Sequence, residues 1–240
     1  MNDKNMTPAL EIYDLQAWYG ESHVLHGVNM RVMPGEVVTL LGRNGAGRTS
    51  TMRAIMGLTG ARKGSIKVNG IETIGMPTHK IAHLGLGYCP EERGIFASLS
   101  CEENLMLPPD LRMGTPGMPV SEIYEMFPNL AERKHSQGTR LSGGEQQMLA
   151  VGRILRTGAK LLLLDEISEG LAPVIVQALA RMIVSLRLKG YTIVMVEQNF
   201  RFAAPLADRL YVMEHGQIVE QFGAAELEAK MPLLNTLLGV

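Results

Sequence analysis

Residues 36–49 read Glu-Val-Val-Thr-Leu-Leu-Gly-Arg-Asn-Gly-Ala-Gly-Arg-Thr, a short apolar run that breaks into glycines. The apolar half of this stretch predicts a buried strand. Gly42, Gly45 and Gly47 then allow the chain to curve tightly, and a helix is expected over Gly47–Met56. A strand, a glycine-rich turn and a helix in this order are typical of α/β proteins with a parallel sheet.

The glycine-rich turn, Gly42–Thr49, matches the pattern G-x-x-x-x-G-K-[ST] at every position except one. In that pattern backbone N–H groups surround phosphates, the helix N-terminus adds a favourable dipole, and the final hydroxyl binds Mg²⁺. Thr49 supplies the hydroxyl, but Arg48 stands where the pattern has lysine. Arginine carries its charge on a broader planar fork, so the exchange is not conservative in a narrow loop. Three interpretations remain open: a tolerated variant, a natural subunit with weak hydrolysis, or an engineered substitution.

The rest of the chain alternates between expected strands and helices. Leu10–Tyr19 and Val28–Val32 alternate apolar and polar residues, which predicts half-exposed antiparallel strands. Pro173 suits the first turn of a helix. The further expected strands are Ser65–Val68, Gly85–Cys89, Leu161–Leu164, Tyr191–Val196, Arg209–Met213 and Gln217–Glu220, and the expected helices are Pro77–Leu84, Pro173–Lys189 and one or two at the C-terminus.

One domain is expected to span residues 1–240. Its segment 91–158 has helical character around a Pro-, Gly- and Met-rich loop at Leu107–Pro119, and we interpret this segment as a helical insertion. Apolar strands that alternate with helices indicate a parallel sheet covered on both faces. The expected parts are an antiparallel β lobe (8–34 and 64–72), an α/β core (35–90 and 159–240) and a helical subdomain (91–158).

The composition argues against several classes of protein. The 240 residues carry a net charge of −1, so no basic face for a nucleic-acid partner is expected. The apolar runs Glu36–Leu41 and Leu161–Leu164 are far shorter than the ~18 residues that span a bilayer. The N-terminal residues have no apolar stretch after their charges, so no secretory signal is expected. Docking at a membrane would therefore require other subunits.

The cysteines and histidines give no sign of a metal or disulfide site. Cys89 and Cys101 lack C-x-x-C spacing, and a reduced, cytosolic setting is the simplest interpretation. His79 and His83 form a helical pair without a nearby carboxylate or thiol. We expect them on a solvent-facing helix and not in a metal site.

Two further motifs carry chemistry in combination with the glycine-rich turn. Leu141-Ser-Gly-Gly-Glu-Gln-Gln147 opens a helix, and Ser142 with Glu145 forms a capping-box pattern. An ordinary helix start would explain this, but the double glycine also exposes successive amides at a positive helix end. Asp165-Glu166 ends a buried strand, where Mg²⁺ would be held and water activated. Each motif alone is weak evidence.

Together and in this order, the motifs resemble the ATP-binding cassette (ABC) family over almost the whole chain. The resemblance implies an α/β P-loop NTPase (RecA-like) core with an antiparallel β lobe and a helical insertion subdomain. It implies ATP and Mg²⁺ as ligands and adenine stacking on Tyr19, for which a lobe-core tyrosine is the alternative. The matching phosphate-binding positions are Gly42, Asn44, Gly45, Ala46, Gly47, Arg48, Thr49 and Ser50.

The resemblance also assigns roles around the phosphates. Thr49 and Asp165 match the Mg²⁺-associated residues, and Glu166 matches the general base that polarises the attacking water. Arg48 is counted among the catalytic residues because it replaces the lysine. Ser142, Gly143 and Gly144 match the signature that reaches ATP held by the opposite protomer, which implies a head-to-tail dimer with two ATP molecules at its interface. The loop Ser168–Leu171 matches the segment through which the two sites touch.

Departures from the family pattern narrow the subfamily. Glu91 stands where most members have a metal-associated glutamine, Gln198 where most have histidine, and Ile167 where most have proline. The variants Pro90-Glu-Glu-Arg93 and Val196-Glu-Gln-Asn199 look like the cassette subunits of bacterial branched-chain amino-acid importers. Close relatives of those subunits serve urea, short amides or aromatic acids. A neutral amide at Gln198 can hydrogen-bond a phosphate oxygen but cannot take a proton.

The implied partners are a second ABC ATPase subunit, identical or different, transmembrane permease subunits and, indirectly, a periplasmic solute-binding protein. The expected location is cytoplasmic, on the inner face of the cell membrane, with docking through Glu91–Ser100 and the helical insertion. A transport ATPase is the leading hypothesis. The alternatives are a cassette of low or regulatory ATPase activity, because of Arg48, and a cassette of translation or DNA repair. Members of the latter class usually duplicate the cassette or carry a long coiled coil, which this chain lacks.

Overall fold

The computed structural model describes residues 6–109 and 116–239, which are organised around two β-sheets. The first sheet has the strand order β2-β1-β4-β5, and its strand pairs are antiparallel. The second has the order β10-β9-β3-β8-β7-β6. The strands are β1 (Leu10–Tyr19), β2 (Ser22–Val32), β3 (Val37–Gly42), β4 (Arg62–Val68), β5 (Ile71–Glu72), β6 (Leu86–Cys89), β7 (Leu161–Asp165), β8 (Thr192–Glu197), β9 (Arg209–Glu214) and β10 (Gln217–Gly223).

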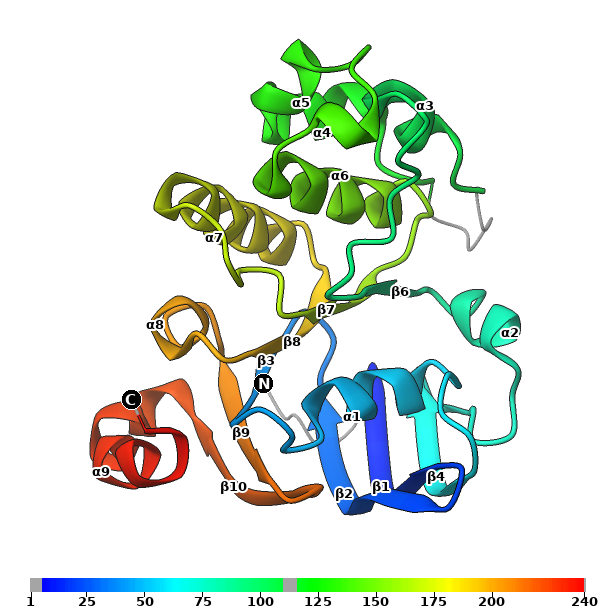
Figure 1. Cartoon of the computed structure of the whole chain (residues 1–240). Coiled ribbons are helices and arrows are strands. Elements are labelled where there is room, and N and C mark those ends of the chain that lie inside the picture. Colours follow the sequence, from blue (N-terminus) through cyan, green and yellow to red (C-terminus); the bar gives the residue numbers. More distant parts are fainter. Residues whose placement is uncertain (1–5, 110–115, 240) are drawn as a thin grey trace.

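The helices lie around these sheets, with α3 to α6 gathered at the end of the molecule opposite the antiparallel sheet (Figure 1). Among the described residues, no helix combines the length and the apolar character that crossing a membrane requires. The helices are α1 (Arg48–Ile55), α2 (Thr78–Ala82), α3 (Cys101–Met106), α4 (Val120–Met126), α5 (Pro128–Glu132), α6 (Gly143–Leu155), α7 (Pro173–Leu188), α8 (Phe200–Ala203) and α9 (Leu227–Leu238).

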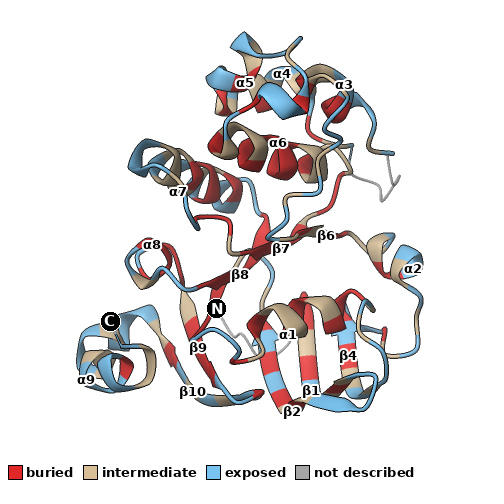
Figure 2. Cartoon of the chain, in the orientation of Figure 1, coloured by how far each residue is buried: buried red, intermediate tan, exposed pale blue. Residues whose placement is uncertain are grey.

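The central strands of the second sheet are buried on both faces (Figure 2). In β7, Leu162 and Leu164 belong to the hydrophobic cluster beneath α6 and α7. Leu161 and Leu163 belong to the cluster shared with the antiparallel sheet and α1. Because successive side chains of a strand point to opposite faces, this division explains why β7 is apolar from Leu161 to Leu164. The α/β class expected from the sequence is confirmed.

Strand register places the ends of three strands at one edge of the sheet. β3 runs parallel to both β8 and β9, with Leu41 opposite Glu197 and Val212. β7 runs parallel to β8, with Asp165 opposite Val196. The glycine-rich turn after β3, the acidic pair at the end of β7 and the segment after β8 therefore emerge together. In open α/β sheets, ligands bind beyond the carboxyl ends of the strands.

The turn between β9 and β10 joins the antiparallel sheet to the glycine-rich turn. Gly216, at φ 76°, donates its N–H to the carbonyl of Ala46 at 2.8 Å and accepts from the N–H of His26 at 2.9 Å. A Cβ at this position would lie 2.4 Å from the carbonyl oxygen of Val24. Only glycine fits so close an approach of three backbone segments.

The start of α6 follows the predicted capping box. The Ser142 hydroxyl accepts from the N–H of Glu145 at 3.3 Å, and the Glu145 carboxylate accepts from the N–H of Ser142 at 2.7 Å. This reciprocal pair satisfies two of the free donors at the helix start.

Some elements differ from the expectation. β2 begins at Ser22, not Val28, because shifts in its pairing with β1 and the positive φ of Gly27 (89°) break the alternation of polar and apolar residues. β5 and α8 were not expected, since elements of two and four residues carry no periodic pattern. Residues 110–115 of the expected loop Leu107–Pro119 lie outside the described residues.

Gly64 provides a test of the antiparallel sheet. Its φ is 98°, and a Cβ there would lie 2.2 Å from the carbonyl oxygen of Asp14. We expect Gly64→Ala to lower the free energy of unfolding by at least about 2 kcal/mol, because backbone strain and a backbone clash add. Gly20→Ala, at φ 55° with open space around it, is the matched control and should cost about 1 kcal/mol. Urea denaturation measures both, and equal losses would contradict this explanation.

Candidate nucleotide-binding site

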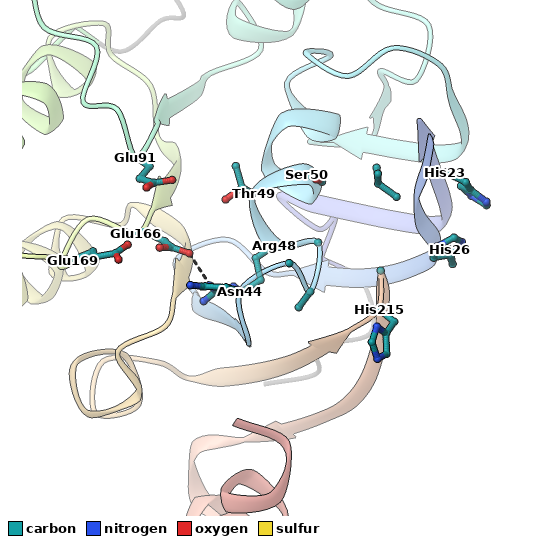
Figure 3. Close-up of a pocket in the computed structure, with 15 residues that line it drawn as sticks. His23, His26, Asn44, Arg48, Thr49, Ser50, Glu91, Glu166, Glu169 and His215 are labelled. Atoms are coloured by element: carbon teal, nitrogen blue, oxygen red, sulfur yellow. Dashed lines mark hydrogen bonds and ion pairs between the residues drawn. The ribbon is translucent and has the colours of Figure 1, made fainter. Parts of the chain in front are cut away.

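A cavity of about 580 Å³ opens between the glycine-rich turn, the β1–β2 hairpin and the end of β7. Figure 3 shows Asn44, Arg48, Thr49 and Ser50 in its middle. The carboxylates of Glu91, Glu166 and Glu169 approach from one side. The rings of His23, His26 and His215 lie on the other side. One half of the cavity is therefore acidic around a buried cation, and the other half is lined by imidazoles.

The glycine-rich turn has the backbone conformation that its sequence predicts. Gly45 and Gly47 have φ values of 81° and 107°, in the region that only glycine adopts without strain. Gly47 occupies the position before α1 and makes no side-chain cap, so the first N–H groups of α1 have no side-chain acceptor at this position. Gly42 packs against β9, where a Cβ would lie 2.6 Å from the carbonyl oxygen of Met213. Free N–H groups at a helix start favour an anion.

Arg48 forms an ion pair with Glu166 across the cavity. Its Nη2 lies 2.7 Å from Glu166 Oε1, and the two side chains are 4% and 10% exposed. The same Nη2 donates to Asn44 Oδ1 at 3.2 Å. Within the described residues, the buried Nη1 has no hydrogen-bond partner. A buried donor without an acceptor is costly, so an anionic ligand in the cavity would stabilise the guanidinium.

Asp165 lies fully buried at the end of β7 and accepts two hydrogen bonds. Thr49 Oγ1 donates to its Oδ1 and the Tyr88 hydroxyl to its Oδ2, each at 3.0 Å. Burial raises the pKa of Asp165, and the two hydrogen bonds act in the opposite direction. The structure thus brings Thr49 and Asp165 together, as the sequence predicted.

Three further carboxylates meet beside this pair. Glu91, Glu166 and Glu169 offer oxygen atoms within 4.8 Å of one another. The pKa of Glu166 is raised by its burial and by the neighbouring Glu169, while the charge of Arg48 opposes the rise. Glu166 also has a φ of 50°, held by donation of its N–H to the carbonyl of Val196 at 2.8 Å. Such a backbone conformation costs energy in a residue other than glycine and is common at functional sites.

The residues present fit a phosphate ligand and Mg²⁺. Arg48 Nη1, which has no hydrogen-bond partner among the described residues, and the N–H groups at the start of α1, which no side chain caps, can donate to a polyphosphate. Thr49, Asp165 and Glu91 supply hydroxyl and carboxylate oxygens, the donor type that Mg²⁺ prefers.

The remaining predicted site residues lie outside this cavity. Tyr19, at the end of β1, is 37% exposed and does not contribute to the cavity lining. Gln198 lines a neighbouring cavity of about 310 Å³ that also includes Glu166. Ser142, Gly143 and Gly144 begin α6, away from the cavity of their own chain. The proposed contact of this helix start with a partner's nucleotide stays a prediction.

The histidines of the cavity were not predicted. The His23 ring stacks on Trp18, with centroids 4.3 Å apart, and its Nε2 lies 2.8 Å from Gln16 Oε1. The His26 ring meets the His23 ring edge-on at 4.1 Å. For His23 and His26, the available signal was their position four and seven residues after Tyr19, the predicted adenine-stacking residue.

Glu197 was also missed, although it joins two loops of the site. Its side chain is 1% exposed at the end of β8. It accepts from the N–H of Ser168 at 3.1 Å and from the Ser168 hydroxyl at 2.7 Å. Burial raises the pKa of Glu197 to about 7, although both hydrogen bonds favour the charged form. An acidic residue within an apolar strand sequence was the available signal.

Known proteins are similar to this chain in sequence. The profile of the family described as "ABC transporter" matches residues 25–169. The chain is 40% identical over 231 residues to the high-affinity branched-chain amino acid transport ATP-binding protein BraG of Pseudomonas aeruginosa, covering 94% of this chain and 97% of the relative. It is 33% identical over 205 residues to the lipopolysaccharide export system ATP-binding protein LptB of Haemophilus influenzae, covering 84% and 85%.

Solved structures share the fold. A nucleotide-free ATP-binding cassette from an ABC transporter matches with a TM-score of 0.81 at 22% identity, covering 94% of this chain and 95% of the other. A dimeric post-hydrolysis cassette bound to ADP and phosphate matches with a TM-score of 0.79 at 19% identity, covering 90% and 98%. The fold is therefore that of a P-loop NTPase cassette, as expected.

The chain belongs to the ABC transporter family. Within that family it is an ATP-binding subunit.

The raised pKa of Glu197 predicts a pH dependence of stability. The folded chain keeps a proton on Glu197 between its ordinary pKa of 4.5 and about 7, whereas the unfolded chain releases it near 4.5. The free energy of unfolding therefore falls as pH rises through this window. Relative to Glu197→Gln, which cannot titrate, the wild type should lose on the order of 2–3 kcal/mol between pH 4.5 and 7.5. Denaturation measured at several pH values tests this. The same change of the free energy of unfolding with pH in both chains would refute it.

Proposed function

We propose that this chain hydrolyses ATP to drive a bacterial importer of branched-chain amino acids, working in the cytoplasm on the inner face of the membrane. The similarity to BraG, 40% identity over 94% of the chain, carries the choice of solute. The Arg48–Glu166–Asp165 arrangement at the end of the parallel sheet supports the chemistry. Importers of urea, amides or aromatic acids remain the alternative solute classes.

The proposed roles follow the geometry. The amides of Gly42–Thr49 and the guanidinium of Arg48 bind the β- and γ-phosphates, and Ser50 at the helix start lies beside them. Thr49, Asp165 and Glu91 hold Mg²⁺, which would neutralise charge on the phosphates. Glu166 orients and polarises the attacking water. Gln198 contributes an amide near the γ-phosphate.

Adenine would be bound on the side of the cavity lined by His23, His26 and His215, with Tyr19 stacking from the end of β1. Ser142, Gly143 and Gly144 would close the site of a second ABC ATPase subunit, because Ser142 is exposed and the positive end of the α6 dipole lies there.

The permease subunits would dock on the face formed by Glu91–Ser100 and the helical insertion. A groove on this face is lined by Arg53, Arg93 and Arg153 among apolar side chains. Arg53 pairs with Glu92 at 2.9 Å, whereas Arg93 and Arg153 have no carboxylate partner among the described residues. The last two therefore suit a permease segment that carries carboxylates. A periplasmic solute-binding protein would act on the permease and not on this chain.

Transport measurements test the solute assignment. Deleting the coding sequence in the source bacterium should abolish uptake of labelled leucine, isoleucine and valine, and the wild-type sequence should restore it. Restoration should fail with Glu166→Gln. Normal uptake of these amino acids with lost uptake of urea, an amide or an aromatic acid would overturn the branched-chain assignment and keep the importer.

A cassette of low ATPase activity is a second candidate, favoured by the ion pair of Arg48 with the proposed general base. A guanidinium at 2.7 Å stabilises the charged carboxylate and occupies one of its oxygens. The unpartnered Nη1 leaves a donor for phosphate, so nucleotide binding suffers less than hydrolysis.

Glu166→Gln should trap an ATP-bound dimer. Glutamine keeps the shape of the side chain and can still accept a hydrogen bond from Arg48, but it cannot serve as a base. We expect light scattering to detect a dimer in excess MgATP that persists for the mutant and decays for the wild type. A mutant that remains monomeric under conditions that dimerise the wild type would remove this role from Glu166.

Arg48→Lys should raise turnover more than affinity. The compact ammonium fits the turn and releases Glu166, so we expect kcat to rise at least about tenfold, within the range of general-base effects, while nucleotide affinity changes less than about threefold. ATPase assays and fluorescent-nucleotide titration measure the two quantities. If both chains hydrolyse ATP at equal rates that depend on Glu166, the low-activity candidate is eliminated. If the wild type does not bind nucleotide and Arg48→Lys does, the affinity prediction is refuted.

A further inference from the structure

A second cavity of about 670 Å³ lies between β6 and α6, and we call it the β6–α6 groove. Its lining includes Arg53, Leu58, Tyr88, Arg93, Arg153 and Ile154. The groove lies on the face that we propose for the permease. Its lining is distinct from that of the nucleotide cavity, which includes Thr49 and Glu166 but none of these six residues.

Tyr88 belongs to the groove and also contacts the nucleotide site. Its ring lines the groove and packs against the hydrophobic cluster shared by the two sheets. Its hydroxyl donates to Asp165 Oδ2 at 3.0 Å. β6 pairs with β7, and Tyr88 lies opposite Leu163, two residues before Asp165. The pairing of β6 with β7 therefore places the Tyr88 hydroxyl beside the Asp165 carboxylate.

Asp165 is held from two directions. Thr49, from the phosphate-binding turn, occupies Oδ1, and Tyr88, from the groove, occupies Oδ2. A tyrosine has one O–H proton, so this hydrogen bond uses the whole donor capacity of Tyr88. The carboxylate can therefore rotate only if one of these two partners moves.

We propose that Tyr88 is a positioning residue that couples the β6–α6 groove to the Mg²⁺-associated carboxylate of Asp165. A permease segment that enters the groove contacts the Tyr88 ring and displaces its hydroxyl, which reorients Asp165. Coupling of this kind is reciprocal, so Mg²⁺-nucleotide binding must also change the groove. The inference rests on the proposed ATPase function and adds the residue through which partner and nucleotide communicate.

The first experiment compares two tyrosine-to-phenylalanine variants of the full chain. Tyr88→Phe removes the hydroxyl and keeps the ring in the groove. Tyr124→Phe, in α4, removes a buried hydroxyl that has no hydrogen-bond partner within the described residues, and it is the matched control. Mg²⁺ is titrated at fixed fluorescent ATP analogue, and binding is read by fluorescence.

Tyr88→Phe should raise the Mg²⁺ concentration for half-maximal binding about tenfold, the lower end of effects seen when a group that orients a metal ligand is removed. Binding in EDTA should stay unchanged, whereas the melting temperature should fall because a buried oxygen of Asp165 loses its donor. Tyr124→Phe should match the wild type in its Mg²⁺ requirement. An unchanged Mg²⁺ requirement in Tyr88→Phe would overturn the positioning role. A lowered melting temperature with the same Mg²⁺ requirement would assign Tyr88 a purely structural role and would overturn it as well.

A second experiment reads the groove itself. Leu58 is 48% exposed in the groove, and Leu58→Cys can carry an environment-sensitive fluorophore. Cys89 and Cys101 are buried, and burial raises their thiol pKa values to about 12 and about 11, so both react slowly. MgATP should change the fluorescence in the wild-type background and with Tyr124→Phe, but not with Tyr88→Phe.

The outcomes separate this inference from the proposed function. A fluorescence response that persists in Tyr88→Phe, or none in a wild-type background that binds MgATP, would overturn the coupling and leave the ATPase intact. A wild-type chain that fails to bind MgATP at all would instead overturn the proposed function, together with this inference.

Discussion

The buried guanidinium of Arg48 is the charge around which the site is assembled. It pairs directly with Glu166, and its charge opposes the rise that burial causes in the pKa values of Glu166, Asp165 and Glu197. Burial raises the pKa of each of these carboxyl groups, so without a cation their charged forms would be strongly disfavoured. The side chains come from the ends of β7 and β8, and Arg48 opens α1, so one charge stabilises the convergence of three elements.

A polyphosphate in the cavity would compete with these carboxylates for the guanidinium of Arg48. The guanidinium must interact with a new anion while it still stabilises the charged forms of Glu166 and Asp165. A buried ion pair is expensive to break when one partner is left alone, but Arg48 can keep Nη2 on Glu166 and offer Nη1. A lysine side chain has one charged nitrogen, which would have to interact with all of these groups. The broader fork of arginine therefore changes how charge is distributed in the site while its amount stays the same.

Much of the site could be predicted from sequence because it depends on local patterns. The glycine-rich turn, the capping box at Ser142 and the position of Asp165 after an apolar strand each follow from a few consecutive residues. Their convergence follows from the rule that parallel strands end at one edge of a sheet. The Arg48–Glu166 pair joins residues 118 positions apart, and it depends on side-chain rotamers that no local pattern encodes. The same holds for the contacts of Tyr88 with Asp165 and of Glu197 with Ser168. The first half of β2 could not be predicted because the bulges in its pairing with β1 break the alternation of polar and apolar residues.

The backbone junction at Gly216 has a consequence for how the molecule can move and change. Because Gly216 donates to Ala46 and accepts from His26, the antiparallel sheet cannot tilt away from the glycine-rich turn without losing at least one of these two hydrogen bonds. The distance between the two sides of the cavity, β2 and the glycine-rich turn, is therefore fixed by main-chain contacts and not by side chains. Although His215 is exposed, the β9–β10 turn is for this reason a poor place for an insertion or an affinity tag, unlike most surface hairpins.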